Sequence, residues 1–326
     1  MQLTVTVSPH IHRKISPKTI MYSVIGALMP ALFGAVYFFG WRTLYITILA
    51  CASAVFSEWL SRKCMRKEFV LDGSAIITGI LLAFNLPVNV SWWIPVIGSA
   101  FAIIIAKQLF GGLGYNILNP ALAGRAFLMA SWPTEMTAKW SAPIRPAGST
   151  ISGLIENISR ATPLNTLKLY GQKIGSTQFN NWTTLKHLFI GNVGGSFGET
   201  SALLLLVGGL GLILFKIIDW RIPLAYIGTL FGLTCIAYLT KLTPASPLFH
   251  ILSGGVFLGA FFMATDYVTS PVTKKGRWIF GIGCGIITFI IRLWGGYPEG
   301  VCFSILLMNC ATPLIERYTR PKRFGT

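Results

Sequence analysis

Long apolar runs separated by short polar connections dominate this chain. An α-helix needs roughly 20 apolar residues to cross the hydrocarbon core of a bilayer, and about ten runs approach that length. The pattern predicts membrane-spanning helices over residues 20–39, 43–60, 72–86, 92–109, 116–132, 201–218, 222–239, 248–265, 278–294 and 301–315. We therefore expect an all-α polytopic membrane protein.

The composition agrees with this expectation. Hydrophobic side chains make up 53% of the 326 residues and charged side chains 11%, whereas about a quarter of a soluble domain is charged. The formal net charge of +17 comes from short basic clusters between the apolar runs, so nucleic-acid binding is not expected. The six cysteines include no Cys-x-x-Cys pair, which predicts small core residues rather than a metal site.

Lys and Arg residues are distributed unequally between the two ends of the predicted spans. The short connections on one side hold only Arg42, Lys241 and Arg292, and the other side collects the basic clusters. Because basic loops stay in the cytoplasm, both termini should be cytoplasmic and residues 133–200 should lie on the outer face. We expect no removed signal peptide, since polar residues precede the first apolar run and no small-residue cleavage site follows it.

A faint internal repeat suggests how the spans are organised. Residues 107–112 (Lys-Gln-Leu-Phe-Gly-Gly) resemble residues 291–296 (Ile-Arg-Leu-Trp-Gly-Gly), and the charge pattern puts the two on opposite faces. Two halves of about five helices each, in inverted topology and with interrupted helices, would give this pattern, as in urea transporters. Chance similarity between glycine-rich apolar segments is the alternative.

This organisation divides the chain into five regions. We expect a cytoplasmic N-terminal segment, a first membrane repeat, an outer-face loop, a second membrane repeat and a cytoplasmic tail, over residues 1–19, 20–132, 133–200, 201–315 and 316–326.

The outer-face loop of roughly seventy residues is longer than connections ordinarily run, which favours a functional role. It places the hydroxyls of Ser159 and Thr162 near the carboxylate of Glu156, and such a threonine can be esterified. Alone, the same residues also fit an ordinary helix start, with Thr162 as N-cap and Pro163 at the first helical position.

Several longer motifs occur along the whole chain in a fixed order, at residues 72–87, 110–121, 194–201, 262–266, 298–301 and 306–309. With these motifs the chain resembles the D subunit of the Rnf electron-transport complex and its relative, the B subunit of the sodium-pumping NADH:quinone oxidoreductase. The resemblance implies a subunit of the prokaryotic cytoplasmic (inner) membrane.

In that family, a threonine in an Asp-x-x-Ser-Gly-Ala-Thr type motif carries FMN through a phosphoester bond, installed by a flavin transferase on the outer face. The matching residues are Glu156, Ser159, Ala161 and Thr162. Glu156 stands where Asp is usual, and Arg160 stands where Gly or Ser is usual. The bulky cation of Arg160 either hinders the transferase or pairs with the flavin phosphate.

Polar residues inside apolar spans are costly and therefore are candidates for function. They are Asp72, Asn85, Asn119, Arg125, Asp266, Glu299 and Asn309. Three of them sit at predicted helix ends, where a solvated cap explains them equally well. Arg125 fits either a structural ion pair or a role toward a flavin. Interrupted helices that point into a central cavity would bind a second, non-covalent flavin or line an ion path.

The resemblance implies a membrane flavoprotein subunit of a ferredoxin:NAD+ oxidoreductase ion pump, which relays electrons through covalent FMN and is coupled to Na+ or H+ translocation. Riboflavin is the implied second flavin. Its partners would be the other Rnf subunits (A, B, C, E and G), the flavin transferase, membrane lipid and, indirectly, ferredoxin and NAD. No residue needs to act as a general acid or base, so catalysis belongs to the assembled complex.

The alternative is a small-solute channel of the urea-channel type without a redox role. The inverted repeat fits such a channel, but the long outer loop with Thr162 is not required by one. The colour of the purified protein separates the two hypotheses, because only the flavoprotein is yellow and fluorescent.

Overall fold

The fold is all-helical in the computed structural model, which describes residues 16–140, 162–174, 179–191, 193–198 and 201–320. The first half contains α1 (Pro17–Phe39), α2 (Trp41–Cys64), α3 (Ser74–Phe84), α4 (Trp93–Ile103), the π-helical η1 (Ile104–Gln108), α5 (Pro120–Ser131) and α6 (Pro133–Thr137). Two helices follow in the connecting segment, α8 (Pro163–Ile174) and α10 (Trp182–Ile190). The second half contains α11 (Ala202–Leu214), α12 (Arg221–Leu239), α13 (Pro247–Leu252), α14 (Val256–Leu258), η2 (Gly259–Met263), α15 (Lys274–Trp294) and α16 (Val301–Thr319).

Four of these helices, α1, α2, α12 and α15, are long and apolar enough to cross a membrane. Three shorter apolar helices accompany them: α3, α4 continued by η1, and α11. The structure thus confirms the sequence prediction of an all-α polytopic membrane protein. The finer prediction, about ten spans in two inverted repeats, stays a prediction.

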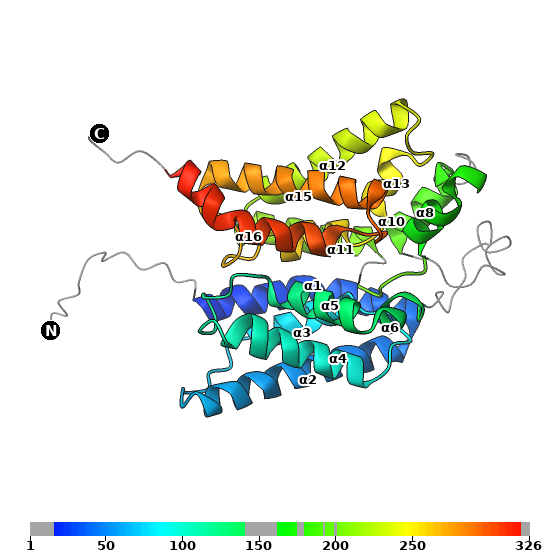
Figure 1. The fold of residues 1–326 in the computed structure, drawn as a ribbon. Helices are drawn as coiled ribbons and strands as arrows, with labels where there is room; N and C mark the ends of the chain where they lie inside the picture. The colour runs from blue at the N-terminus through cyan, green and yellow to red at the C-terminus, as the bar shows by residue number, and fades with distance from the viewer. Residues whose placement is uncertain (1–15, 141–161, 175–178, 192, 199–200, 321–326) are drawn as a thin grey trace, which may run out of the picture.

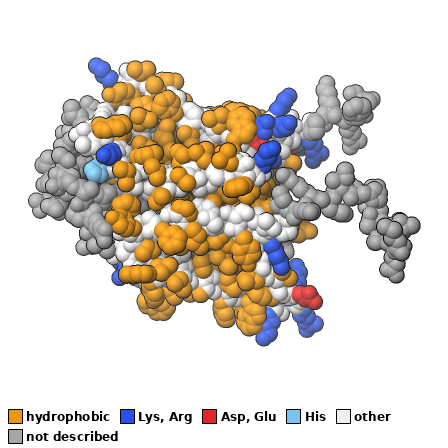
Figure 2. Space-filling model, turned by 180° about the vertical axis from the view of Figure 1, so that it is seen from behind, with side chains coloured by type: hydrophobic (Ala, Val, Ile, Leu, Met, Phe, Trp, Pro, Cys, Tyr) orange, Lys and Arg blue, Asp and Glu red, His pale blue; other side chains and the backbone are white. Residues whose placement is uncertain are grey.

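The two halves lie side by side as two layers (Figure 1). In the same view α1 begins and α16 ends at one end of the bundle, and α6, α8 and α10 lie at the other end. Figure 2 shows Lys and Arg side chains mainly at the end where α1 begins, and hydrophobic side chains over the width of the molecule between the two ends. Such a hydrophobic band with a basic margin is the surface expected of a protein that spans a bilayer.

The halves meet closely where α1 packs against α11. A Cβ atom added to Gly208 of α11 would lie 2.2 Å from the carbonyl oxygen of Ala27 in α1. Only glycine permits this approach, as is typical where membrane helices pack through small residues.

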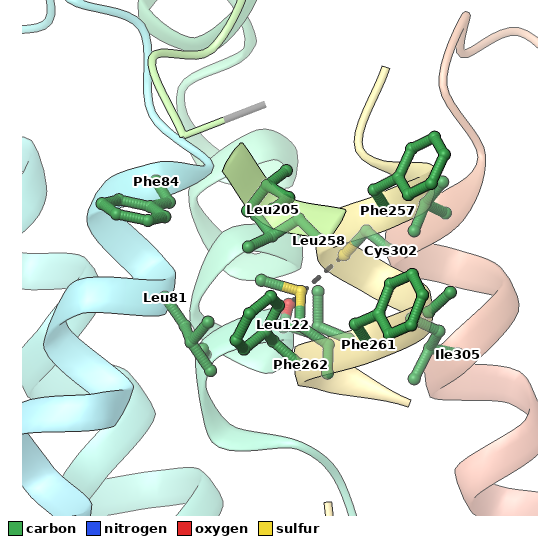
Figure 3. Close-up of a cluster of buried hydrophobic side chains, with 14 of the residues drawn as sticks. Leu81, Phe84, Leu122, Leu205, Phe257, Leu258, Phe261, Phe262, Cys302 and Ile305 are labelled. Atoms are coloured by element: carbon green, nitrogen blue, oxygen red, sulfur yellow. Dashed lines mark hydrogen bonds between the residues drawn. The ribbon is translucent and has the colours of Figure 1, made fainter. Parts of the chain in front are cut away.

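Buried side chains from both halves fill the interior between the layers. Figure 3 shows the side chains of Leu81 in α3 and Leu122 in α5 next to Phe262 of η2. The thiol of Cys302 in α16 donates to the carbonyl of Leu122 at 3.5 Å. Helix α3 is buried along most of its length, and a helix that is apolar all round belongs in such an interior.

The predicted span 248–265 is interrupted rather than continuous. Helix α13 ends at Leu252, and a bend over residues 253–255 separates it from α14 and η2. Gly254 in this bend has φ +70°, a left-handed conformation that side chains with a Cβ rarely adopt. The interruption exposes backbone carbonyls inside the protein, and these carbonyls become part of the site described next.

Candidate functional site

Thr162 caps the N-terminus of α8. Its side-chain oxygen accepts from the backbone N–H of Asn165 at 3.3 Å, and its carbonyl accepts from the backbone N–H of Thr166 at 2.9 Å. Pro163 occupies the first helical position, so the helix-start prediction is confirmed. The Thr162 residue is only 6% exposed. The other predicted attachment residues, Glu156, Ser159, Arg160 and Ala161, lie outside the residues that the structure describes.

A small pocket borders Thr162. It is lined by the first residues of α8, the segment 193–196, the bend at Gly254, and Glu299 just before α16. Its volume is about 30 Å³, which is the space that one water molecule occupies. The pocket therefore joins four segments that are far apart in the sequence around one hydroxyl-bearing residue.

Gly254 is the point where three of these segments touch. A Cβ atom at this position would lie 2.7 Å from Leu164 Cδ1 and 3.1 Å from Arg292 Nη2. The same atom would lie 3.7 Å from Glu299 Cγ. Close packing and the positive φ both require glycine here, so the site depends on the interruption between α13 and α14.

Arg292, near the end of α15, ties the interruption to the start of α16. Its Nε donates to the carbonyl of Glu299 at 2.9 Å, and its Nη2 donates to the carbonyl of Ser253 at 3.0 Å. A third donation, from Nη1, goes to the carbonyl of His250. The fixed fork of a guanidinium suits several carbonyls at once. Sequence reasoning counted Arg292 only as a loop charge; its place beside Gly295-Gly296 was the available signal.

Three of the predicted intramembrane residues come together next to this pocket. Arg125 of α5, 3% exposed, donates to the carboxylate of Glu299 and to the side-chain oxygen of Asn85. Asn85 at the end of α3 donates in turn to the carbonyl of Leu81 at 2.6 Å. Burying these charges costs less because each is paired and hydrogen-bonded. The chain of contacts runs from the Thr162 pocket into the protein interior.

The charges of this group have a chemical consequence. The guanidiniums of Arg125 and Arg292 both contact Glu299, through its carboxylate and its carbonyl respectively. Glu299 lines the Thr162 pocket, so both guanidiniums lie next to a residue of its wall. Guanidinium groups form strong charge-assisted hydrogen bonds with phosphate oxygens.

The other predicted residues are placed differently. Asn119 caps α5, accepting from the N–H groups of Ala121 and Leu122, and its amide donates to the carbonyl of Met263 at 3.1 Å. Asn309 is 1% exposed within α16. It lies eight residues after Val301, the first residue of this helix, or roughly 12 Å along the helix axis.

Asp72 and Asp266 lie near a second, larger cavity. Its volume is about 90 Å³, and its polar lining consists of Ser74, Thr78, Lys107, Asn116, Asn119, Thr265 and Asp266. Asp72 caps the start of α3 by accepting from the N–H of Ser74 at 2.9 Å. Asp266 accepts from the hydroxyl of Thr269 at 3.2 Å. Asp72 thus satisfies one backbone donor at the start of α3, whose N-cap is Gly73, and Asp266 faces the cavity.

A buried ion pair that the sequence did not predict borders this second cavity. Lys107 Nζ donates to Glu58 Oε1 at 2.8 Å and to Ser74 Oγ at 2.6 Å. Gln108 Nε2 donates to the same Glu58 oxygen at 2.7 Å. The signal was a carboxylate inside an apolar run. Among the described residues, no group of His, Cys, Asp and Glu is arranged to hold a metal ion.

The fold and site define a polytopic helical membrane protein whose two halves are joined by buried charged side chains beside a capped threonine. The chain matches the model of the NQR2, RnfD, RnfE family over residues 4–325 and belongs to that family.

Individual relatives match over nearly their whole length. The chain is 51% identical to the D subunit of the Na(+)-translocating ferredoxin:NAD(+) oxidoreductase complex of Acetobacterium woodii, covering 100% of this chain and 96% of the relative. It is 46% identical to the D subunit of the proton-translocating ferredoxin:NAD(+) oxidoreductase complex of Clostridium ljungdahlii, covering 99% and 96%. It is 39% identical to the D subunit of the ion-translocating oxidoreductase complex of Escherichia coli strain SE11, covering 100% and 99%.

Proposed function

We propose that this chain is the flavoprotein membrane subunit of a ferredoxin:NAD+ oxidoreductase ion pump of the Rnf type. In this proposal FMN is bound covalently to Thr162, and electron flow is coupled to Na+ or H+ translocation. The full-length similarity to the D subunits of such complexes supports the proposed complex and its other subunits as partners. Their names include both a Na+-translocating and a proton-translocating complex, so we leave the ion open.

The observation that carries the FMN assignment is the pocket at Thr162. The side-chain oxygen of Thr162 would become the ester oxygen, and the guanidiniums of Arg125 and Arg292 would attract the phosphodiester. The residue types suit the linking group, but the pocket of about 30 Å³ is far smaller than the 300 Å³ or more typical of a small-molecule site. The flavin ring must therefore lie outside the pocket. Bound FMN supplies one- and two-electron redox chemistry, and the protein supplies its position and surroundings.

We place the outer face at α8 and α10 and both termini in the cytoplasm. The unequal Lys and Arg distribution supports this orientation, as does the basic end at which α1 begins and α16 ends. We also retain the inverted repeat. Helix α3 is short and buried, and the group α13, α14 and η2 is interrupted and buried; short membrane helices of this kind are expected of paired broken helices.

The second cavity is our proposed location for the ion path or for the polar edge of a riboflavin-type second flavin. Its lining residues Asn119 and Asp266 come from both halves, as alternating access requires. A volume of about 90 Å³ accommodates a few water molecules or a partly hydrated ion. Binding of a flavin ring here requires the cavity to widen.

Covalent flavin in the purified complex tests the proposed function. After co-expression with the flavin transferase, the denatured subunit should fluoresce in a gel, Thr162→Ala should abolish the signal, and Thr162→Ser should retain it because the hydroxyl remains. The Thr162→Ala complex should also lose electron transfer from reduced ferredoxin to NAD+. A colourless wild-type protein under these conditions favours the channel alternative instead.

A further inference from the structure

The acceptor hydroxyl of the proposed flavin site is not accessible in the folded chain. Thr162 is 6% exposed, and its oxygen is occupied as the cap of α8. The adjoining pocket of about 30 Å³ admits a water molecule but not a phosphate group that carries a flavin. A transferase is a macromolecule that must bring the phosphorus atom into line with this oxygen, so it cannot act on the arrangement in the structure.

One contact that keeps α8 in place is polar and lies at the surface. Lys168, one turn and a half into α8, donates from Nζ to the carbonyls of Gly295 and Tyr297, the latter at 3.3 Å. These carbonyls belong to the connection between α15 and α16, which also contains Glu299. Lys168 thus joins the helix that begins at Thr162 to the segment that closes the Thr162 pocket.

The second contact is apolar and buried. Leu164, 4% exposed, is part of a hydrophobic cluster with Phe179, Leu185, Leu188 and Phe249. This cluster is separate from the main core between the two halves. A small satellite cluster and a surface lysine are the kind of attachment that opens locally without unfolding the rest of a protein.

We propose that Thr162 receives FMN while α8 is undocked, and that α8 docks afterwards with the new phosphodiester at the edge of the pocket. The inference rests on the proposed function and adds the order of events. Lys168 and Leu164 then set the fraction of protein in which the hydroxyl is accessible. The modification rate is the product of that fraction and the rate on the open form.

The chemistry of the step constrains the donor. A bond forms between Thr162 Oγ and the phosphorus of FMN, and the phosphorus–oxygen bond to a leaving group breaks. The hydroxyl proton passes to a base of the transferase, and nothing is oxidised or reduced. The donor is therefore an activated flavin nucleotide of the flavin-dinucleotide class, which releases the second nucleotide. Docking then places the phosphodiester beside the positive charge of Arg125 and Arg292.

A time course with purified full-length protein tests this order. Unmodified protein in detergent micelles is mixed with the transferase and its flavin dinucleotide, and covalent flavin is followed by intact mass. Lys168→Ala should raise the initial rate about three- to tenfold, the effect of losing an ordinary hydrogen bond at the surface. Lys168→Arg, which keeps the donors, should stay near the wild-type rate.

Lys186→Ala is the matched control. This exposed lysine lies on the neighbouring helix α10, so its loss removes the same charge near the site without affecting the α8 contact. The control should react at the wild-type rate. Leu164→Ala should also accelerate the reaction because it weakens the apolar attachment.

The outcomes separate the two proposals. Hydrogen exchange at the Asn165 and Thr166 amides shows whether the two variants undock α8 more often. If exchange increases in Lys168→Ala and Leu164→Ala but both are modified at the wild-type rate, the undocking order is overturned and the flavin site remains. Slower modification of both variants would overturn it as well. If neither the wild-type protein nor Lys168→Ala acquires covalent flavin, the result contradicts the proposed function itself.

Discussion

Two buried ion pairs, Lys107–Glu58 and Arg125–Glu299, show how different roles arise from the same kind of interaction. The pair Lys107–Glu58 is 2% exposed at both ends and is completed by Ser74 and Gln108, all within the first half. The pair Arg125–Glu299 joins residues 174 positions apart in the two halves. The first pair can therefore hold one half together, whereas the second couples the halves.

The surroundings of the two pairs sharpen this difference. Glu58 accepts from Lys107, Gln108 and Arg62, so its carboxylate is surrounded by donors. Glu299 borders the pocket of Thr162, and it accepts from two guanidiniums, through its carboxylate from Arg125 and through its carbonyl from Arg292. Lys107 also lines a cavity, the larger one, but its pair with Glu58 lies within one half. A pair that joins the two halves and borders the pocket of a modifiable hydroxyl is the better candidate for function.

The largest effect on stability should come from breaking the saturated pair. Lys107→Met leaves the Glu58 carboxylate buried without its cation, and the free energy of unfolding should fall toward the upper end of about 3–5 kcal/mol. Thermal unfolding of the purified protein in detergent measures this loss. The double variant Glu58→Gln/Lys107→Met removes both charges and should recover most of the stability; a double variant as unstable as the single one contradicts the scaffold role.

Breaking the pair between the halves should cost somewhat less stability but more function. Arg125→Gln should destabilise the protein by about 3 kcal/mol, because Glu299 borders the pocket and is partly hydrated. The double variant Arg125→Gln/Glu299→Gln should regain stability while electron transfer to NAD+ in the assembled complex stays impaired. Full recovery of electron transfer in the double variant would assign Arg125–Glu299 to structure only.

A smaller effect is expected at the junction of the segments. Gly254→Ala forces a Cβ into the left-handed region and toward Leu164, so about 1–3 kcal/mol of strain should result. Because the added Cβ pushes against Leu164, it should displace α8 and change the amount of covalent flavin per amount of folded protein. Intact mass and thermal unfolding of the same sample measure both quantities, and Gly211→Ala in α11, where nothing lies within 4 Å of the added Cβ, is the matched control.

The smallest effect should follow Arg160→Gly. The buried guanidiniums of Arg125 and Arg292 already supply positive charge at the pocket, so a further cation in the attachment motif is not required. If the Arg160 side chain is solvated, its charge contributes little, and we expect covalent flavin yield to change by less than about twofold. A severalfold fall in yield would make Arg160 a phosphate partner, and a severalfold rise would show that it hinders the transferase.

Local sequence signals predicted the parts of the structure that local physics determines. Thr162 followed by Pro163 predicted a helix start, and α8 begins there. Apolar runs predicted the long helices well because membrane-spanning length is a local property of the sequence.

The contacts of the site depend on tertiary structure and were beyond local reasoning. Arg125, Asn85 and Glu299 were each predicted as costly polar residues, but nothing in the sequence paired them across 40 and 174 positions. The sequence did not predict the role of Arg292, because its acceptors are backbone carbonyls, which every residue type carries. Glu58 was missed because one carboxylate in an apolar run has no visible partner until α2 packs against η1.

The mass of the peptide that contains Thr162 tests the central claim most directly. Protein purified from cells that co-express the flavin transferase is digested, and the peptide is fragmented to locate any added mass. We predict one FMN, less the water lost on ester formation, attached at Thr162 and absent from the Thr162→Ala variant. An unmodified peptide from wild-type protein, or FMN attached at another residue such as Ser159, would contradict the account.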